Sequence, residues 1–182
     1  VRASRTPGDS VHAARQQFGI LALALLLLAA LLLPRSLLAE DGYDLWLRYR
    51  PIPVAEAAAV RTRVAQLVAP ATTPTQQATR DELLRGLGGL LGAAPSLSDA
   101  ANVDGAVIVG TPASSKQIAG LKLATKDLGD EGYRIASVKL DGRNAIAIAA
   151  NTDAGAMHGA FHFLRLLETR QPLGALDIRR AP

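Results

Sequence analysis

Residues 131–170 read EGYRIASVKLDGRNAIAIAANTDAGAMHGAFHFLRLLETR, and this stretch decides the fold. Its first part, Gly132–Leu140, alternates between two faces with the period of a half-buried strand. Asp141-Gly142 is the strongest short signal for a hairpin turn, and Ala145–Ala150 supplies the second strand. The stretch therefore predicts two antiparallel strands joined by a tight turn.

A helix is predicted directly after this hairpin. Asn151 or Thr152 can cap its start, and the pattern continues to about Thr169. Pro172 ends the helix, and Leu176–Ile178 is expected to begin another strand. Apolar residues at helical spacing are predicted to face the core: Met157, Ala160, Phe161, Leu164 and Leu167.

Further strands are predicted before the hairpin. Tyr43–Arg50 alternates with period two, and prolines follow it. Val54–Ala69 is ambiguous, and we expect a short helix or turn and then a strand over residues 63–69. Ala93–Asn102 is expected to be a loop. The apolar run Asp104–Gly110, DGAVIVG, is typical of a central strand buried on both faces.

Two more helices are expected in this part of the chain. For the longer one, within Ala71–Leu91, Thr73 can cap the start, Pro74 suits the first turn and Gly92 is a good stop. Its apolar stripe consists of leucines: Leu83, Leu84, Leu87, Leu90 and Leu91. The shorter one is capped by either of two serines, Ser114 or Ser115, and reaches Leu121. The order is roughly β, β, α, β, α, β, β, α, which predicts an α+β (α/β layered) fold with one mixed β-sheet and packed helices.

Residues 1–39 resemble a secretory signal. Arginines precede the apolar run Phe18–Leu33, which at 16 residues is short for a membrane span of about 20. We place cleavage after Ala39, and an uncleaved N-terminal anchor is the alternative. Either reading predicts an exported protein, periplasmic or extracellular, whose globular domain occupies residues 40–182.

The charge distribution argues against nucleic acid as a partner. The net charge is +4, but residues 1–39 hold four arginines and one aspartate, so three of these charges belong to the leader. The remaining residues are nearly neutral, without the basic patch that nucleic acid requires. There are no cysteines, which excludes disulfides, thiolate metal sites and cysteine nucleophiles.

Several groups of polar residues have the residue types of a metal or catalytic site but lack the spacing or the partner residues that such a site needs. His158 and His162 lie four apart on one helix, but Gly159 stands where the helical zinc motif has its glutamate. They are therefore expected at the surface or in packing. Asp130-Glu131 is expected to be a polar strand entrance, since glycoside hydrolysis needs two opposed carboxyl groups about 5–9.5 Å apart. Asp153 is explained by the helix dipole.

Three other motifs are given structural roles. The glycine-rich residues 86–92 lack phosphate-loop spacing and are predicted to let another element pack closely. Ser114, Ser115 and Lys116 have no general base beside them. Trp46 is read as a half-buried strand residue. We therefore predict no catalytic, cofactor-binding or metal-binding residue in this chain.

Several segments, in order, resemble the N-terminal domain of the α-glucuronidases of glycoside hydrolase family 67. The likeness covers essentially all of residues 40–182, and His158 departs from it where an aromatic residue is expected. The segments are EDGYDLWLRY (40–49), RDELLRGLGGLLG (80–92), DGAVIVGTP (104–112), LGDEGYRI (128–135) and IAIAANTDAGAMHGAFHFLRLLETR (146–170).

The resemblance implies an enzyme of xylan catabolism that removes glucuronic acid, or its 4-O-methyl form, from glucuronoxylan oligosaccharides. In that family the carboxylates lie on a (β/α)₈ barrel, which needs roughly 250 residues and is expected to be absent from this chain. The domain would dock on that barrel, need no cofactor, and allow a homodimer of the parent enzyme. The alternatives are the similar small domain of β-N-acetylhexosaminidase-like glycosidases and a free-standing carbohydrate-binding module.

Overall fold

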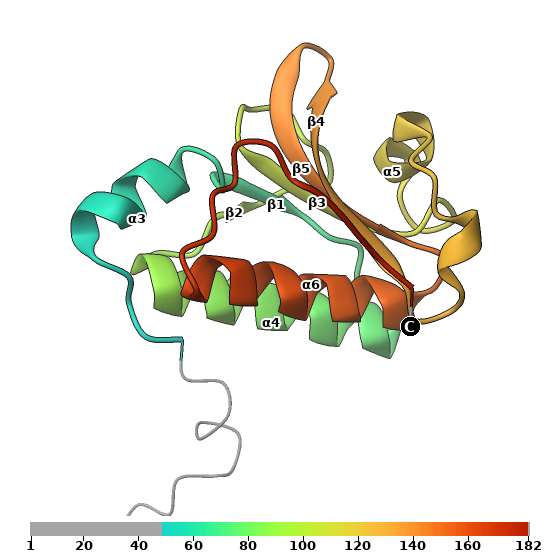
Figure 1. Cartoon of the computed structure of the whole chain (residues 1–182), viewed down its shortest axis with the longest axis horizontal. Coiled ribbons are helices and arrows are strands. Elements are labelled where there is room, and N and C mark those ends of the chain that lie inside the picture. Colours follow the sequence, from blue (N-terminus) through green and yellow to red (C-terminus); the bar gives the residue numbers. More distant parts are fainter. Residues whose placement is uncertain (1–48, 182) are drawn as a thin grey trace, which may run out of the picture. The chain divides into compact units, whose positions relative to one another are not determined.

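The computed structural model describes residues 49–181, and the predicted hairpin lies within its sheet (Figure 1). Strands β4 (Tyr133–Leu140) and β5 (Arg143–Ala150) are antiparallel, and their register pairs Leu140 with Arg143. Asp141 and Gly142 have φ of 49° and 81°. Two successive left-handed residues are what a type I′ turn requires, so the prediction of a tight hairpin is confirmed.

The sheet is mixed and has the order β2-β1-β3-β5-β4-β6. Strands β1 (Gln66–Val68) and β3 (Ala106–Gly110) run parallel to β5, and all five residues of β3 are buried, as predicted. The short β2 (Ser96–Leu97) extends the parallel part at one edge. Strand β6 (Asp177–Arg180) pairs antiparallel with β4 at the other edge.

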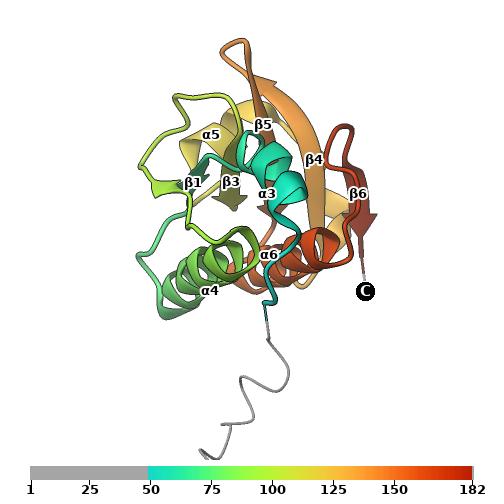
Figure 2. The ribbon, with the colours of Figure 1, turned by 90° about the vertical axis from the view of Figure 1, so that its left-hand side faces the viewer.

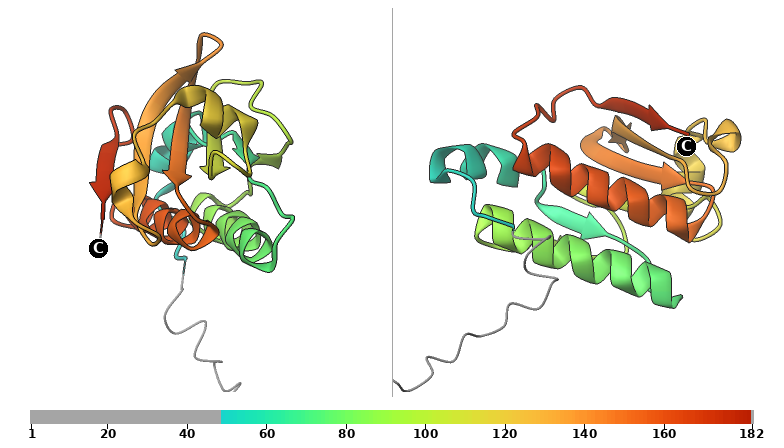
Figure 3. Two further views of the ribbon diagram at one scale, coloured as in Figure 1. Left: turned by 90° about the vertical axis from the view of Figure 1, so that its right-hand side faces the viewer. Right: turned by 60° about the horizontal axis from the view of Figure 1, so that its bottom comes forward.

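Helices cover both faces of this sheet. Figures 1 and 2 show α4 (Pro74–Leu91) and α6 (Asp153–Glu168) side by side on one face, with the short α5 (Lys116–Leu121) on the other. Figure 3 shows the same layers from two further sides. Helix α3 (Val54–Arg61) precedes β1, and a 3₁₀ turn, η1 (Lys126–Leu128), precedes β4. The predicted mixed sheet with packed helices is confirmed.

Local signals set the ends of the helices as predicted. The Thr73 hydroxyl accepts from the amide of Gln76, whose side chain accepts from the Thr73 amide, so α4 begins with a full capping box. Thr152 caps α6 and Ser115 caps α5 through their hydroxyl groups. Gly92 ends α4 in the left-handed conformation.

The glycine-rich end of α4 allows close packing, as predicted. A Cβ on Gly86 would lie 2.7 Å from a methyl carbon of Leu164 on α6. A Cβ on Gly89 would lie 2.8 Å from that of Tyr49. These glycines therefore let α4 approach α6 and the incoming chain more closely than an alanine would.

The structure differs from the predicted local structure at several points. The Tyr43–Arg50 strand lies mostly outside the described residues, and neither Tyr49 nor Arg50 is in a strand. The predicted loop Ala93–Asn102 contains β2, which is short and exposed and therefore carries no apolar pattern. The 3₁₀ turn η1 lies where no element is predicted, and β6 begins at Asp177, within the segment Leu176–Ile178 that is expected to begin a strand.

The core stripe of α6 is also rotated from its predicted position. Phe161 is exposed and Met157 is half-buried, whereas Ala156 and Phe163 are buried with the rest. The helix presents small residues to the sheet, since a Cβ on Gly159 would lie 2.6 Å from Ile148. The predicted stripe is therefore wrong at Phe161, and Met157 lies at its margin.

We expect Gly120→Ala to stabilise the chain by about 0.5 kcal/mol, because alanine has the higher helix propensity. Gly120 lies in α5 and is exposed, and in the described part of the chain a Cβ there would meet no atom within 4 Å. Urea unfolding of the wild type and the variant measures the difference. A destabilised variant would contradict the helical assignment of residues 116–121.

Candidate functional site

The carboxyl ends of parallel strands are the usual ligand position in open α/β sheets. In this chain the N-termini of α4 and α6 meet at that end, where paired helix dipoles attract negative charge. The carboxylate of Asp153 lies between these two helix N-termini and takes the position that an anionic ligand would have. It accepts a hydrogen bond from the Thr73 hydroxyl at 2.8 Å and one from the Gln76 side-chain amide at 3.0 Å.

This end of the sheet therefore has little room for a ligand. The hollow between Gly110, Gln76 and Asp153 has a volume of only about 10 Å³. That is at most the space of one water molecule. Asp153, predicted only as an acid suited to the helix dipole, in fact joins the starts of two helices.

We expect Asp153→Ala to destabilise the chain by about 1–2 kcal/mol, because the Thr73 hydroxyl and the Gln76 amide both lose their acceptor. Asp153→Asn keeps one acceptor oxygen and should lose less. Denaturant midpoints of the two variants measure the effect. Equal losses in both would show that the charge matters more than the hydrogen bonds.

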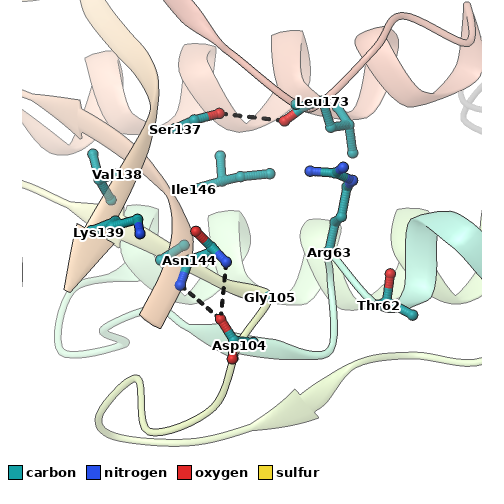
Figure 4. Close-up of a pocket in the computed structure, with 12 residues that line it drawn as sticks. Thr62, Arg63, Asp104, Gly105, Ser137, Val138, Lys139, Asn144, Ile146 and Leu173 are labelled. Carbon is teal, nitrogen blue, oxygen red and sulfur yellow. Dashed lines mark hydrogen bonds between the residues drawn. The ribbon is translucent and has the colours of Figure 1, made fainter. Parts of the chain in front are cut away.

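The larger hollow lies at the opposite end of the sheet, at the amino ends of the parallel strands. Figure 4 shows it between the α3–β1 connection, the loop before β3, the β4–β5 hairpin and the segment before β6. Its volume is about 460 Å³. The lining residues are Thr62, Arg63, Asp104, Gly105, Ser137, Val138, Lys139, Asn144, Ala145, Ile146, Leu173 and Gly174.

Hydrogen bonds fix the walls of this hollow (Figure 4). Oδ1 of Asp104 accepts from the backbone amide of Asn144 at 2.8 Å and from its side-chain amide at 3.2 Å. The Ser137 hydroxyl donates to the carbonyl of Leu173 at 3.3 Å and accepts from the amide of Leu176 at 2.9 Å. Both contacts join segments more than 30 residues apart in the chain, so folding itself shapes the hollow.

Two cations line the hollow. Figure 4 shows the guanidinium of Arg63 on one side of Ile146 and Lys139 on the other. Within residues 49–181, neither side chain forms an ion pair. The only lining carboxylate in that part of the chain is Asp104, so the lining carries a net charge of +1. This arrangement can bind an anion, and it holds only one of the two carboxyl groups that glycoside hydrolysis requires.

His158 and His162, four residues apart on α6, contact two different groups. Nδ1 of His162 lies 2.8 Å from the Tyr133 hydroxyl, and Nδ1 of His158 lies 3.2 Å from the carbonyl oxygen of Glu131. Across residues 49–181 no three His, Cys, Asp or Glu side chains gather as metal ligands. His162 therefore packs against Tyr133, and His158 is exposed beside the entrance to β4.

The environment of His162 lowers its pKa. The main cause is burial of the ring, which disfavours the charged form, and the positive charges of Arg180 and Arg165 add to it. Burial raises the pKa of Tyr133, and Arg180 partly opposes that change. The two rings meet edge to face at 5.6 Å between centroids.

This lowered pKa predicts a pH-dependent stability. Between the two pKa values of His162, the unfolded chain binds more protons than the folded chain, so acid favours unfolding. Stability should therefore fall as the pH drops through the ordinary value of 6.5, and level off below the folded pKa. Urea midpoints at about pH 7.5 and 5.5 measure it. The difference should shrink in His162→Gln but persist in the matched control His158→Gln.

The other polar candidates lie apart from the hollow. Asp130 and Glu131 are exposed at the entrance to β4, where their carbonyls accept from Thr152 and His158. The hydroxyl of Ser114 accepts a hydrogen bond from the amide of Thr111, in the turn after β3. Trp46 lies outside the described residues. No single motif indicated the hollow, because four separate segments form it.

The apolar segment that is predicted to be a signal or an anchor also lies in residues that the structure does not describe. Among residues 49–181, no helix has the length and apolar character needed to cross a membrane. The predicted signal at residues 1–39 is outside that range.

Comparison with known proteins gives consistent results. The family described as "Glycosyl hydrolase family 67 N-terminus" matches residues 45–163. The chain is 32% identical over 146 residues to alpha-glucuronidase A of Emericella nidulans, covering 78% of this chain and 17% of that protein. It is 28% identical over 132 residues to a probable alpha-glucuronidase A of Neosartorya fischeri, covering 71% of this chain and 15% of that protein.

A solved structure was also matched. It is a family GH115 4-O-methyl-α-glucuronidase with specificity for decorated arabinogalactans, 24% identical with a TM-score of 0.47. The match covers 57% of this chain and 13% of that one. This chain thus spans less than a fifth of the length of each of these relatives.

Proposed function

Because this chain belongs to the family of glycosyl hydrolase family 67 N-terminal domains, we propose that it is the non-catalytic N-terminal domain of an exported α-glucuronidase. The observation that carries the proposal is the family match over residues 45–163, which spans most of the described fold. The substrate of the whole enzyme is glucuronic acid, or its 4-O-methyl form, linked to xylan-derived oligosaccharides. The catalytic carboxylates belong to a barrel outside this chain, on which the domain docks.

The chemistry of the hollow supports a non-catalytic role. An acid and a base or nucleophile must flank the bond that is hydrolysed, about 5–9.5 Å apart. Asp104 is the one carboxyl group that lines the hollow among residues 49–181, and the amides of Asn144 hold it. The sheet and its helices then serve to hold and stabilise the neighbouring barrel.

Two measurements test this function. The purified chain should release no glucuronic acid from 4-O-methylglucuronosyl xylo-oligosaccharides, and no N-acetylhexosamine from a chitin oligosaccharide. A chimera of the Emericella nidulans enzyme, with its matching N-terminal region replaced by this chain, should hydrolyse the first substrate. The same enzyme with that region deleted is the matched control and should be less stable. Release of glucuronic acid by this chain alone would overturn the proposal.

The location of the protein is part of the proposal. The leader at residues 1–39 would direct export, with cleavage after Ala39 giving a mature start at Glu40. N-terminal sequencing of the protein recovered from the periplasm or the medium tests this. A mature chain that retains the apolar run Phe18–Leu33 would indicate an anchor instead.

A further inference from the structure

We propose that the hollow at the amino ends of the strands is a binding site for an acidic sugar unit, a uronic acid, separate from the site of hydrolysis. The inference rests on the proposed function, because a glucuronidase works where sugars that bear a carboxylate are abundant. It deepens that function by giving the N-terminal domain a ligand of its own. The geometry of Figure 4 carries the argument.

The size of the hollow suits one sugar unit. Small-molecule sites in proteins are typically about 300–1,000 Å³, and this hollow has a volume of about 460 Å³. Its walls are held by hydrogen bonds between distant segments, from Asp104 to Asn144 and from Ser137 to Leu173. A site with fixed walls loses less conformational entropy when a ligand binds.

The charges favour a ligand with a single negative charge. Arg63 can bind a carboxylate through two parallel N–H···O bonds, and Lys139 adds a second positive charge. Asp104 lowers the sum to +1. Helix α3 ends at Thr62, which lines the hollow. The C-terminus of a helix carries a partial negative charge, which opposes a second negative charge on the ligand. A phosphate with two charges is therefore less well matched than a carboxylate.

The remaining lining suits the ring of a sugar. Ile146 and Leu173 line the hollow, and the small exposed part of each side chain can contact the C–H groups of the ring. The hydroxyl of Thr62 donates to the carbonyl of Ala59, so its oxygen is available to accept from a ligand hydroxyl. The side chain of Asn144 is exposed at the rim. Among residues 49–181 no aromatic ring lines the hollow, so we expect weak binding, with a Kd on the order of 1 mM.

The direct test is a titration of the ¹⁵N-labelled chain with methyl α-D-glucuronoside, followed by the backbone amide spectrum. We expect saturable shifts at Gly105, Asn144 and Gly174, which line the hollow. The neutral methyl α-D-glucoside lacks the carboxylate and should bind at least about tenfold more weakly. Acetate has the carboxylate without the ring and should also bind at least about tenfold more weakly.

Two matched variants locate the site. Arg63→Gln should weaken binding of the glucuronoside at least about tenfold, because the bidentate contact is lost. Arg165→Gln removes an exposed arginine on α6, which does not line the hollow, and should bind like the wild type. A dispersed amide spectrum for each variant shows that it is folded.

Several results would overturn the inference: equal binding of glucoside and glucuronoside, equal binding of acetate, shifts outside the hollow, or no saturable shift at about 10 mM ligand. Undiminished binding by Arg63→Gln would overturn it as well. The hydrolysis assays keep the two proposals apart. If the chimera hydrolyses its substrate while this chain binds no glucuronoside, the proposal of a sugar site is wrong. The assignment as an N-terminal domain then still stands.

Discussion

Gly105→Ala is expected to destabilise the chain by at least about 3 kcal/mol. Gly105 precedes β3 with a φ of +80°, where an L side chain is strained. A Cβ at this position would also overlap the carbonyl oxygen of Thr62, and it would lie 3.0 Å from the carbonyl carbon of Arg63. These are backbone atoms, so no side chain can move aside to accommodate it. Urea unfolding of the variant measures the loss.

Gly142→Ala is the matched control for this change. Gly142 has nearly the same φ, +81°, but a Cβ there would meet no atom of residues 49–181 within 4 Å. Only the conformational strain of a left-handed alanine remains, about 1–2 kcal/mol. The difference between the two variants isolates the close approach of Gly105 to Thr62. Equal losses in both variants would contradict that contact.

The same close approach shapes the hollow. The Gly105 carbonyl accepts from the Ala65 amide at 2.8 Å, and its amide donates to the Asn144 carbonyl at 2.8 Å. Gly105 therefore ties the start of β1 to the hairpin while Arg63 and Asn144 line the space between them. Loss of Gly105 should damage both the stability of the fold and the sugar site.

Features set by neighbours in the chain were predictable from the sequence. The Asp141-Gly142 turn, the Thr73 cap with Pro74, and the buried run before Gly110 each carry a local rule that the structure confirms. Features set by distant contacts were not predictable. Asp153 bonds to residues 77 and 80 positions away. The short strand β2 exists only through its pairing with β1.

The candidate site could not be predicted from the sequence for the same reason. Arg63, Asp104, Lys139 and Leu173 come from four segments that have no common motif. Each residue alone has the appearance of a solvent-exposed charge or a loop leucine. The sheet order, which places β1, β3, β5 and β4 side by side, brings them to one end of the sheet.

A second large loss of stability is expected from a change on the buried face of α6. Phe163→Ala should destabilise the chain by about 3–5 kcal/mol, because the ring is fully buried in the larger core cluster and its loss leaves a cavity. Phe161→Ala should cost less than about 1 kcal/mol, since 37% of that residue is exposed. Urea unfolding of both variants, measured in parallel, gives the comparison.

The comparison of the two phenylalanine variants distinguishes two orientations of α6. The spacing of large apolar residues in the sequence favours Phe161 as the core residue, whereas the close contact of Gly159 with Ile148 turns Phe163 inward. A larger loss in Phe161→Ala than in Phe163→Ala would restore the first orientation. His162 lies between these two residues in the chain, and in the structure its Nδ1 lies 2.8 Å from the Tyr133 hydroxyl. The pH dependence of His162→Gln and the phenylalanine pair therefore test one helix orientation by independent measurements.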